Sequence, residues 1–391
     1  MNRQGFKQTG VGENKQMPIK SIVAGASLLA ISFGAAFAQG APVTVPTSVA
    51  ERGFFFVGGE YVGEAGKQIM RGQMYVEALK PKAVTKPYPI VLIHGAAQTA
   101  TNWMQTPDGR KGWAEFFIER GYMVYMVDQP ARGRSAWHAE ANGALRMFTA
   151  PQLETLFTAS AALGKWPQAN KHTQWPGSGR QGDPVFDAFY ATQVQSLASD
   201  LETQTLAQKA GAALLDRIGP AILLTHSQSG LLGWVIAEAR PQLVKAIVAV
   251  EPSGPPFHNA APNNPKARAF GITDLPVAYD PPIASADDLK TQVQEKPEAD
   301  GLIACTLQSS PPRKLKNFAS IPTLITVSEA SYHAPYDHCT ARYMQQAGAP
   351  VDFVRLEEKS IRGNGHMVML EKNNLEVAGF LADWVESKVK K

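Results

Sequence analysis

Several features that mark whole classes of protein are scarce or missing in this sequence. Only two cysteines, Cys305 and Cys339, occur in 391 residues, and neither has a neighbouring pattern of metal ligands, so we expect no metal site. No basic stripe with interleaved aromatic residues is present, which argues against nucleic-acid binding. No strand-like run leads into a Gly-x-Gly-x-x-Gly turn, so a nicotinamide cofactor is not expected either.

Net charge is also low outside the N-terminal segment. Charged residues make up 18% of the chain and hydrophobic residues 44%, which is typical of a globular protein with a sizeable core. The formal net charge is +4, but residues 1–38 hold four basic residues and one acidic residue. The remaining chain is therefore close to neutral. Its length allows one large α/β domain or two smaller ones.

The N-terminus has the pattern of a secretory signal. Lys15 and Lys20 precede an apolar run at residues 22–37, and Ala36-Phe37-Ala38 fits the small-x-small cleavage pattern. We therefore expect a signal peptide at residues 1–38, a mature chain at 39–391, and a secreted or periplasmic protein. No later apolar run is long enough to span a membrane. An uncleaved N-terminal anchor and a start at Met17 stay open as alternatives.

Export allows the two cysteines to form a disulfide bond. Cys305 and Cys339 flank a predicted strand at residues 321–328, so a bridge between them is sterically reasonable. It would close a loop of about 34 residues, worth roughly 3–4 kcal/mol in the chain-entropy model. Two free thiols are the alternative.

Apolar strand-like runs alternate with helical segments along most of the chain. Such alternation predicts a doubly wound α/β sheet, preceded by an antiparallel start at residues 45–80. Two excursions interrupt it: residues 136–206, rich in aromatics and predicted to be an inserted helical lid, and residues 258–315, rich in proline. The predicted strands lie at residues 89–93, 123–127, 221–224, 243–250, 321–327 and 351–356.

The run at 221–224 leads into Thr225-His226-Ser227-Gln228-Ser229 and then into a helical segment. A strand that stops at a serine between small residues and continues as a helix is typical of a nucleophile elbow. Ser227 is therefore the candidate nucleophile. The amide of Gln228, at a helix N-terminus, is a candidate donor to an oxyanion. An ordinary strand–helix turn capped by serine is the competing interpretation.

A serine hydroxyl needs a base, normally a histidine held by a carboxylate. His366 has the best context, because it follows the last predicted strand in a Gly-x-Gly-His turn. Glu251 and Glu329 each close an apolar strand between Ser227 and His366, and the residues alone do not separate these two acids. Asp337 is a third option for the acid. Two further histidines, His333 and His338, are predicted to be surface or lid residues.

The second oxyanion donor should come from the turn after the first core strand, His94-Gly95-Ala96-Ala97. Gly95 allows a close backbone approach, and the amide of Ala96 is our candidate.

Taken together, these residues resemble the α/β-hydrolase superfamily from about residue 50 to the end. Three stretches resemble more narrowly a branch of secreted microbial carboxylesterases, alkaline esterases with a helical lid. In that branch the acid is a glutamate after the sixth strand, which favours Glu251. Thr225, Ser229 and Ala96-Ala97 depart from the usual glycines, and the last of these puts bulky tertiary-alcohol esters in doubt. The three stretches are residues 94–110, 128–135 and 251–256.

The sequence thus predicts a cofactor-free serine carboxylesterase acting on small-molecule or oligomeric esters, with a homodimer among the expected assemblies. A polyester, lactone or amide hydrolase with the same residues is the first alternative. A catalytically dead binding module is the second, and a dehalogenase is excluded because its elbow needs Asp where this chain has Ser227.

Overall fold

The computed structural model describes residues 48–260 and 265–390 of the chain. The signal peptide predicted at residues 1–38 lies outside the described residues. Among the described residues, no helix combines the length and the apolar character needed to cross a membrane.

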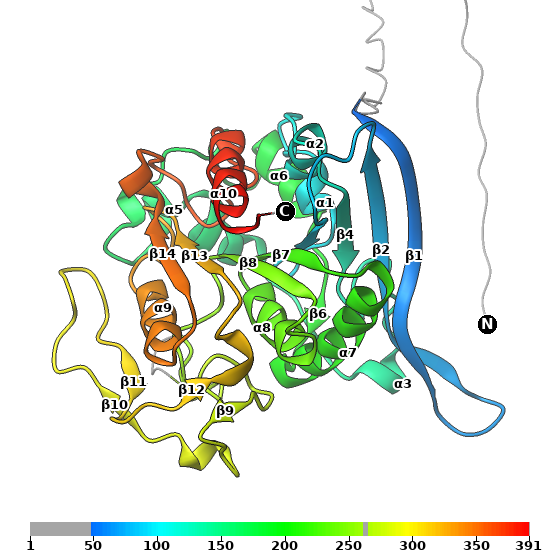
Figure 1. Cartoon of the computed structure of the whole chain (residues 1–391). Helices are drawn as coiled ribbons and strands as arrows, with labels where there is room; N and C mark the ends of the chain where they lie inside the picture. Colours follow the sequence, from blue (N-terminus) through cyan, green and yellow to red (C-terminus); the bar gives the residue numbers. More distant parts are fainter. Residues whose placement is uncertain (1–47, 261–264, 391) are drawn as a thin grey trace, which may run out of the picture. The chain divides into compact units, whose positions relative to one another are not determined.

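An eight-stranded sheet runs through the centre of the molecule in the order β1-β2-β4-β3-β7-β8-β13-β14 (Figure 1). The pairs β1–β2 and β2–β4 are antiparallel, and every later pair is parallel. This confirms the mostly parallel sheet and its antiparallel start. The strands are β1 (Val49–Val62), β2 (Ile69–Pro81), β3 (Ile90–Ile93), β4 (Val124–Asp128), β7 (Ala221–His226), β8 (Val244–Val250), β13 (Thr323–Val327) and β14 (Val351–Arg355).

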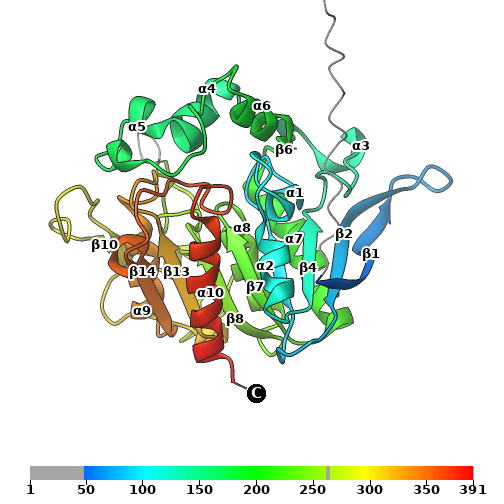
Figure 2. The same ribbon diagram turned by 90° about the horizontal axis from the view of Figure 1, so that it is seen from above.

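Helices cover both faces of the sheet, and the side chains of β3 show how the core divides (Figure 2). Ile90 and Leu92 pack in one apolar cluster with α2 (Trp113–Glu119) and α10 (Asn374–Lys388). Val91 and Ile93 face the other cluster, which holds α7 (Asp200–Ile218), α8 (Ser229–Ala239) and α9 (Asp337–Gln346). Because successive strand residues point to opposite faces, a short apolar strand serves both layers. The other described helices outside the two excursions are the short α1 (Thr101–Met104) and η5 (Leu356–Lys359).

Short helices and two short strands make up the predicted lid. In Figure 2 its helices α4, α5 and α6 form an arch along one side of the molecule. The predicted lid boundary near residue 206 lies inside α7 and moves to about residue 199. Ser199 caps α7 by accepting a hydrogen bond from the amide of Glu202 (3.1 Å). The lid elements are α3 (Ala139–Asn142), β5 (Leu145–Arg146), α4 (Ala150–Leu153), the π-helix η1 (Glu154–Thr158), α5 (Ser160–Leu163), η2 (Ala169–Lys171), α6 (Pro184–Ala191) and β6 (Ser196–Leu197).

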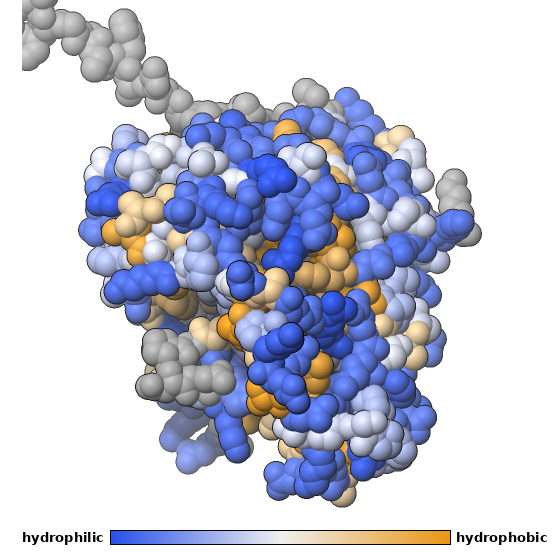
Figure 3. Space-filling view, turned by 90° about the vertical axis from the view of Figure 1, so that its left-hand side faces the viewer, coloured by the Kyte–Doolittle hydropathy of each residue, from blue (hydrophilic) through white to orange (hydrophobic). Residues whose placement is uncertain are grey.

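The second excursion consists of short strands and 3₁₀ turns beside α9 (Figure 1). A disulfide between Cys305 and Cys339 joins it to that helix. Figure 3 faces the side of the molecule that carries this excursion: it is mostly hydrophilic, with hydrophobic atoms gathered near its middle. The elements are β9 (Tyr279–Asp280), η3 (Ala286–Asp288), β10 (Thr291–Val293), β11 (Thr306–Gln308), β12 (Lys314–Leu315) and η4 (Lys316–Phe318).

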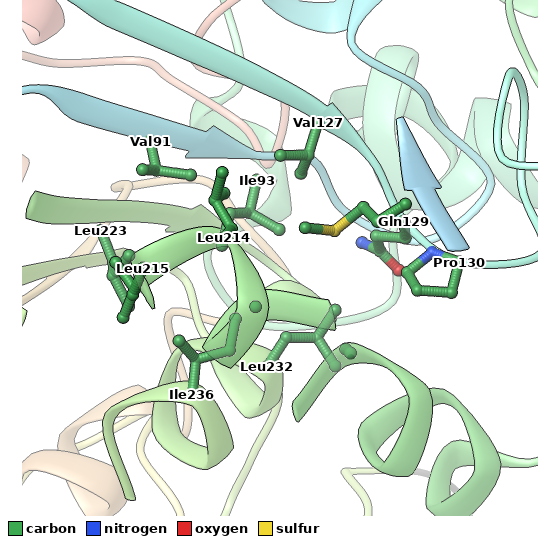
Figure 4. A pocket seen from close by; sticks show the side chains of 13 residues that line it. Val91, Ile93, Val127, Gln129, Pro130, Leu214, Leu215, Leu223, Leu232 and Ile236 are labelled. Atoms are coloured by element: carbon green, nitrogen blue, oxygen red, sulfur yellow. The ribbon is translucent and has the colours of Figure 1, made fainter. Parts of the chain in front are cut away.

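A small cavity lies under the sheet, between β3 and β7 and the helices α7 and α8 (Figure 4). Its volume is about 10 Å³, at the lower limit for one water molecule. Val91, Leu214, Leu223 and Ile236 are among its lining side chains. It is therefore a packing gap of the core and not a substrate site.

Candidate active site

Ser227 stands in a strained turn between β7 and α8. Its φ is +57°, a left-handed conformation that a residue other than glycine adopts at an energetic cost. The backbone is held there from two sides: the Ser227 amide donates to Val250 O (3.0 Å), and the Ser253 amide donates to Ser227 O (3.0 Å). This is the geometry of a nucleophile elbow.

The two residues that replace the usual elbow glycines fit because their surroundings adapt to them. Ser229 is fully buried, and its hydroxyl accepts from the His226 amide (2.8 Å) and donates to Ile93 O (2.6 Å). Thr225 packs its methyl group over Gly233, where an added Cβ would lie only 2.9 Å from Thr225 Cγ2. Ser229 therefore ties the elbow to β3, and Gly233 makes room for Thr225.

His366 and Glu251 meet beside this elbow. The distance from His366 Nδ1 to Glu251 Oε2 is 2.5 Å, and both side chains are fully buried. Glu251 follows β8, the sixth strand of the central sheet along the chain, and has a φ of +49°. Its carboxylate also accepts from the Ser328 amide (2.8 Å) and from Ser331 Oγ (2.5 Å). The acid is thus fixed on both oxygens.

Burial sets the protonation of this pair. Loss of solvent lowers the pKa of His366 well below its usual range, and the neighbouring His333 lowers it further. Burial likewise raises the pKa of Glu251 to about 7, while His333 and the hydrogen bonds from Ser331 and Ser328 act in the opposite direction. Both shifts disfavour the charged forms of this pair. The ring nitrogen of His366 that does not contact Glu251 is Nε2. That atom is buried and has no protein hydrogen-bond partner among the described residues.

Glu329, the other candidate acid, lies in a different set of contacts. One oxygen accepts from Arg362 (3.3 Å) and lies 3.4 Å from Lys171 Nζ, and the other accepts from the Gly363 amide (3.0 Å). Glu329 thus supports the loop that carries His366 without touching its imidazole ring. Asp337, the third option, is bonded to His333 Nδ1 (2.9 Å).

The prediction that His333 and His338 are surface or lid residues is wrong, since both are buried. His333 stacks on His366 with ring centroids 4.7 Å apart and an interplanar angle of 11°. His338 packs beside the disulfide, with Nε2 3.5 Å from Cys339 Sγ. A polar strand-end loop gives no sequence signal for burial, because the packing comes from segments far away in the chain.

Rings enclose His366 on several sides. Besides His333, the rings of His226, Tyr332 and Phe157 lie 4.4, 4.8 and 4.9 Å from it, measured between centroids. Phe157 belongs to η1 of the predicted lid, so the lid directly contacts His366, the candidate base. A hydrogen bond with Ser227 acts to lower the pKa of Tyr332, but burial outweighs it and raises that pKa. Only 7% of the Ser227 surface is exposed.

The turn after β3 lies against the elbow. A Cβ added to Gly95 would lie 3.0 Å from His226 Nδ1 and 3.1 Å from Ser227 Cβ, so a larger residue here would have to push the elbow away by a few tenths of an ångström. Ala96 follows directly, and Gln228 is the N-cap residue of α8. The structure therefore brings both predicted oxyanion residues close to Ser227 in the fold.

A second Ser-His-Glu set, which sequence reasoning missed, joins the lid to the loop of His366. Ser160 Oγ lies 2.7 Å from His172 Nδ1, and His172 Nε2 lies 2.7 Å from Glu371 Oε1. Glu371 in turn accepts from the Gly365 amide (2.9 Å), one residue before His366. All three side chains are buried. Contacts between residues about 200 positions apart leave no local pattern to find.

Two groups of side chains have donor atoms close enough to hold a metal ion among the described residues. In the first group, Cys305 and Cys339 are joined to each other, so they offer no thiolates. The second consists of Glu251, His333 and His366, with atoms within 4.8 Å of one another. Since Glu251 already bonds His366, this group is better explained by hydrogen bonding alone.

Comparisons with known proteins agree with this geometry. The model of the alpha/beta hydrolase family matches residues 90–380. A protein of Fungal sp. (strain ATCC 74256), named probable secreted lipase phiG, is 50% identical over 336 residues, which cover 86% of this chain and 89% of that protein. A solved structure described as a novel bacterial esterase has a TM-score of 0.60 and 24% identity, covering 90% of this chain and 98% of the other. At that identity the solved structure shows the shared fold alone.

Proposed function

Because the chain belongs to the α/β-hydrolase family, we propose that it is a secreted serine carboxylic ester hydrolase with Ser227, His366 and Glu251 as its triad. The name of the 50% identical relative, a probable secreted lipase, supports both ester hydrolysis and secretion. Export through cleavage of residues 1–38 is part of the proposal.

The proposed reaction is acyl transfer to Ser227 followed by hydrolysis. Ser227 Oγ attacks the ester carbonyl as His366 Nε2 takes its proton, and a tetrahedral oxyanion forms. His366 then gives that proton to the leaving alcohol, and the acyl group stays on Ser227. A water molecule, deprotonated by His366, attacks the acyl-enzyme, and the carboxylic acid leaves as Ser227 regains its proton.

Two other groups stabilise these steps. Glu251 holds Nδ1–H of His366, which leaves Nε2 free as the acceptor, and it stabilises the imidazolium that forms transiently. The amides of Ala96 and Gln228 are the proposed donors to the oxyanion. Removing one such donor typically costs about 3 kcal/mol of transition-state stabilisation.

One observation carries the proposal: the His366–Glu251 contact beside a left-handed Ser227. An unpartnered, buried Nε2 on a histidine whose other nitrogen is held at 2.5 Å by a carboxylate is an energetic cost to the fold. A catalytic base explains that cost, because this atom must be free to accept a proton. Two other buried histidines, His226 and His338, also have one unpartnered nitrogen, but their other nitrogen contacts a backbone carbonyl and a disulfide sulfur and not a carboxylate.

The experiment replaces Ser227 with Ala and measures p-nitrophenyl acetate hydrolysis and labelling by a fluorophosphonate probe. We expect both to fall to background. Ser160→Ala is the matched control, because Ser160 also contacts a histidine but is enclosed by the lid, and this variant should still take the label. Hydrolysis that persists in Ser227→Ala would refute the proposed nucleophile. If the wild-type chain neither hydrolyses esters nor takes the label, the result would favour a catalytically dead binding module.

The relative's name also favours acylglycerols as substrates. Polyester, lactone and amide substrates would use the same triad, since only the leaving group and the pocket differ. A panel of acetyl to long-chain p-nitrophenyl esters, triacylglycerols, lactones, oligomeric polyesters and anilides separates these classes by kcat/KM.

A further inference from the structure

Arg132 is a buried guanidinium behind the candidate oxyanion turn. Only 3% of its surface is exposed. Nη1 donates to Gly95 O (2.9 Å), and Nη2 donates to Gln228 Oε1 (3.1 Å). Among the described residues no carboxylate comes within ion-pair distance of it, and its Nε has no partner. Its burial and its two partners therefore need an explanation other than an ion pair.

Arg134, two residues later on the same loop, has the ion pairs that are typical of a structural arginine. It bonds Asp128 (2.8 Å) and Glu77 (2.7 Å) and lies over the Tyr75 ring at 3.9 Å. Arg132 has none of these. Burial lowers the pKa of Arg132 to about 9, Arg146 lowers it as well, and Asp128 and Asp200 raise it. The side chain therefore carries its charge at neutral pH, and a buried charge without a paired counter-ion is costly.

The first contact of Arg132 controls the direction of one oxyanion donor. The carbonyl of Gly95 and the amide of Ala96 belong to one planar trans peptide, so they point in opposite directions. Gly95 O also accepts a hydrogen bond from Nδ1 of His94 (2.9 Å). The other ring nitrogen of His94, Nε2, accepts from the Gln129 amide (3.2 Å). Holding Gly95 O between Arg132 and His94 consequently turns the Ala96 N–H the other way.

The second contact concerns the other donor. Gln228 supplies the amide after the nucleophile, and its side-chain carbonyl is held by Nη2 of Arg132. One planar guanidinium thus bridges the turn after β3 and the start of α8, the two segments that supply the proposed donors. A lysine offers a single ammonium where this bridge needs two separated N–H groups.

We propose that Arg132 is the positioning residue of the oxyanion hole, aligning the amides of Ala96 and Gln228 and adding positive potential behind the anion of the tetrahedral intermediate. This inference rests on the proposed ester hydrolysis at Ser227. In this role Arg132 stabilises the transition state and does not stabilise the bound ester. The variant should therefore change kcat and leave KM nearly unchanged.

The experiment compares Arg132→Met, Arg132→Lys and the control Arg134→Met in the full mature chain. Two quantities are measured: kcat and KM with p-nitrophenyl acetate, and the inhibition constant of a trifluoromethyl ketone, which forms an anionic tetrahedral adduct on the serine. Arg132→Met should lower kcat about 100-fold with KM within about threefold. Its affinity for the ketone should fall in parallel. Arg132→Lys should recover part of both losses, because it keeps the charge but not the bridge.

Arg134→Met should lower thermal stability, since it breaks two ion pairs, while kcat and ketone affinity change less than about threefold. The proposal is overturned if folded Arg132→Met keeps wild-type kcat and ketone affinity, or if substrate and ketone binding weaken equally. If Arg132→Met does not fold, Arg132→Lys decides: unchanged ketone affinity there overturns the proposal, and a selective loss supports it. Absence of ester hydrolysis and of fluorophosphonate labelling in the wild-type chain would instead refute the proposed function.

Discussion

The candidate nucleophile Ser227 is one of four residues with left-handed backbones that follow strands of the central sheet. Ser227 and Glu251 have φ values of +57° and +49°, and Ala97 and Ala131 both have +60°. Each follows the carboxyl end of a central strand, so strain that costs on the order of 1–3 kcal/mol per residue is concentrated at one edge of the sheet. In open α/β folds this edge is where ligands bind. The strain is best understood as the cost of aiming the Ser227 hydroxyl and the Glu251 carboxylate.

The choice between the two acids can be tested at single residues. Glu251→Gln removes the carboxylate that bonds His366 Nδ1, and a glutamine favours the wrong imidazole tautomer, so kcat should fall by about 10⁴-fold. Glu329→Gln keeps its hydrogen-bonding shape, and kcat should stay within about tenfold of wild type. Ester hydrolysis is the measurement, with circular dichroism to show that both variants fold. A larger loss in Glu329→Gln would reverse the assignment.

The residues themselves could not decide between these acids in advance. Glu251 and Glu329 both end apolar strands on the same edge of the sheet, and both stand between Ser227 and His366 in the chain. What separates them is side-chain direction: the loop at residues 362–366 passes over Glu329 with its backbone and reaches Glu251 with its imidazole. Only the resemblance to a known family favoured Glu251.

At the scale of elements, the predicted lid is bonded to the loop that carries His366. Beyond the contact of His172 with Glu371, the amides of Thr173 and Gln174 donate to Gly363 O (2.9 and 3.2 Å). A Cβ added to Gly365 would meet His172 Nε2 at 2.8 Å. The segment around His172 therefore acts as a support for the His366 loop as well as a part of the lid.

Replacing His172 with Leu tests this support. The change leaves Ser160 and one side of the buried Glu371 without a partner, which should lower stability by about 1–3 kcal/mol. Local opening of the lid should also become easier, so trypsin should cleave at the exposed Arg180 faster than in wild type. Thr149→Ala, which removes an exposed cap within the lid, serves as the control. Cleavage rates equal in His172→Leu and wild type would argue against the support.

Elements with strong periodicity could be predicted, and elements defined by distant contacts could not. The apolar runs ending at Ile93, Val250 and Val327 became β3, β8 and β13 because both faces of those strands are covered by helices. Strands of two residues, such as β5 and β6 in the lid, carry no periodic signal. The lid boundary predicted near residue 206 overlooks the Ser-x-x-Glu pattern of Ser199 and Glu202, a helix-start signal that coincides with the N-terminus of α7.

For the whole molecule, buried histidines determine how stability responds to acid. Burial holds the pKa of His94 at about 3 and that of His333 at about 4, and it holds His226 and His366 well below 6.5. Stability from such groups is fully present above pH 6.5 and is lost as the pH falls toward their folded pKa values, because only the unfolded chain binds the protons.

Two buried acids act in the opposite direction between pH 4.5 and 7. The pKa of Glu251 is raised to about 7 and that of Asp337 is raised well above its usual range, so the folded chain holds those protons. The four histidines outnumber these two acids, so unfolding takes up protons on balance and the stability should fall from pH 6 to pH 5. Urea unfolding at pH 7, 6 and 5 measures this, and a midpoint that does not fall with pH would contradict it.

The aromatic enclosure of His366 has a consequence for binding equilibria. Ser227 exposes 7% of its surface and His366 none, so we expect an ester to reach them only in molecules where the enclosing side chains, among them Phe157, have moved. The apparent dissociation constant then equals the intrinsic one divided by the open fraction: with about 1% of molecules open, binding weakens about 100-fold. Replacing Phe157 with a smaller residue should raise the open fraction and so recover part of the lost affinity. The gain in affinity should be similar for substrates of different chemistry, because it comes from the open fraction and not from contacts with the substrate.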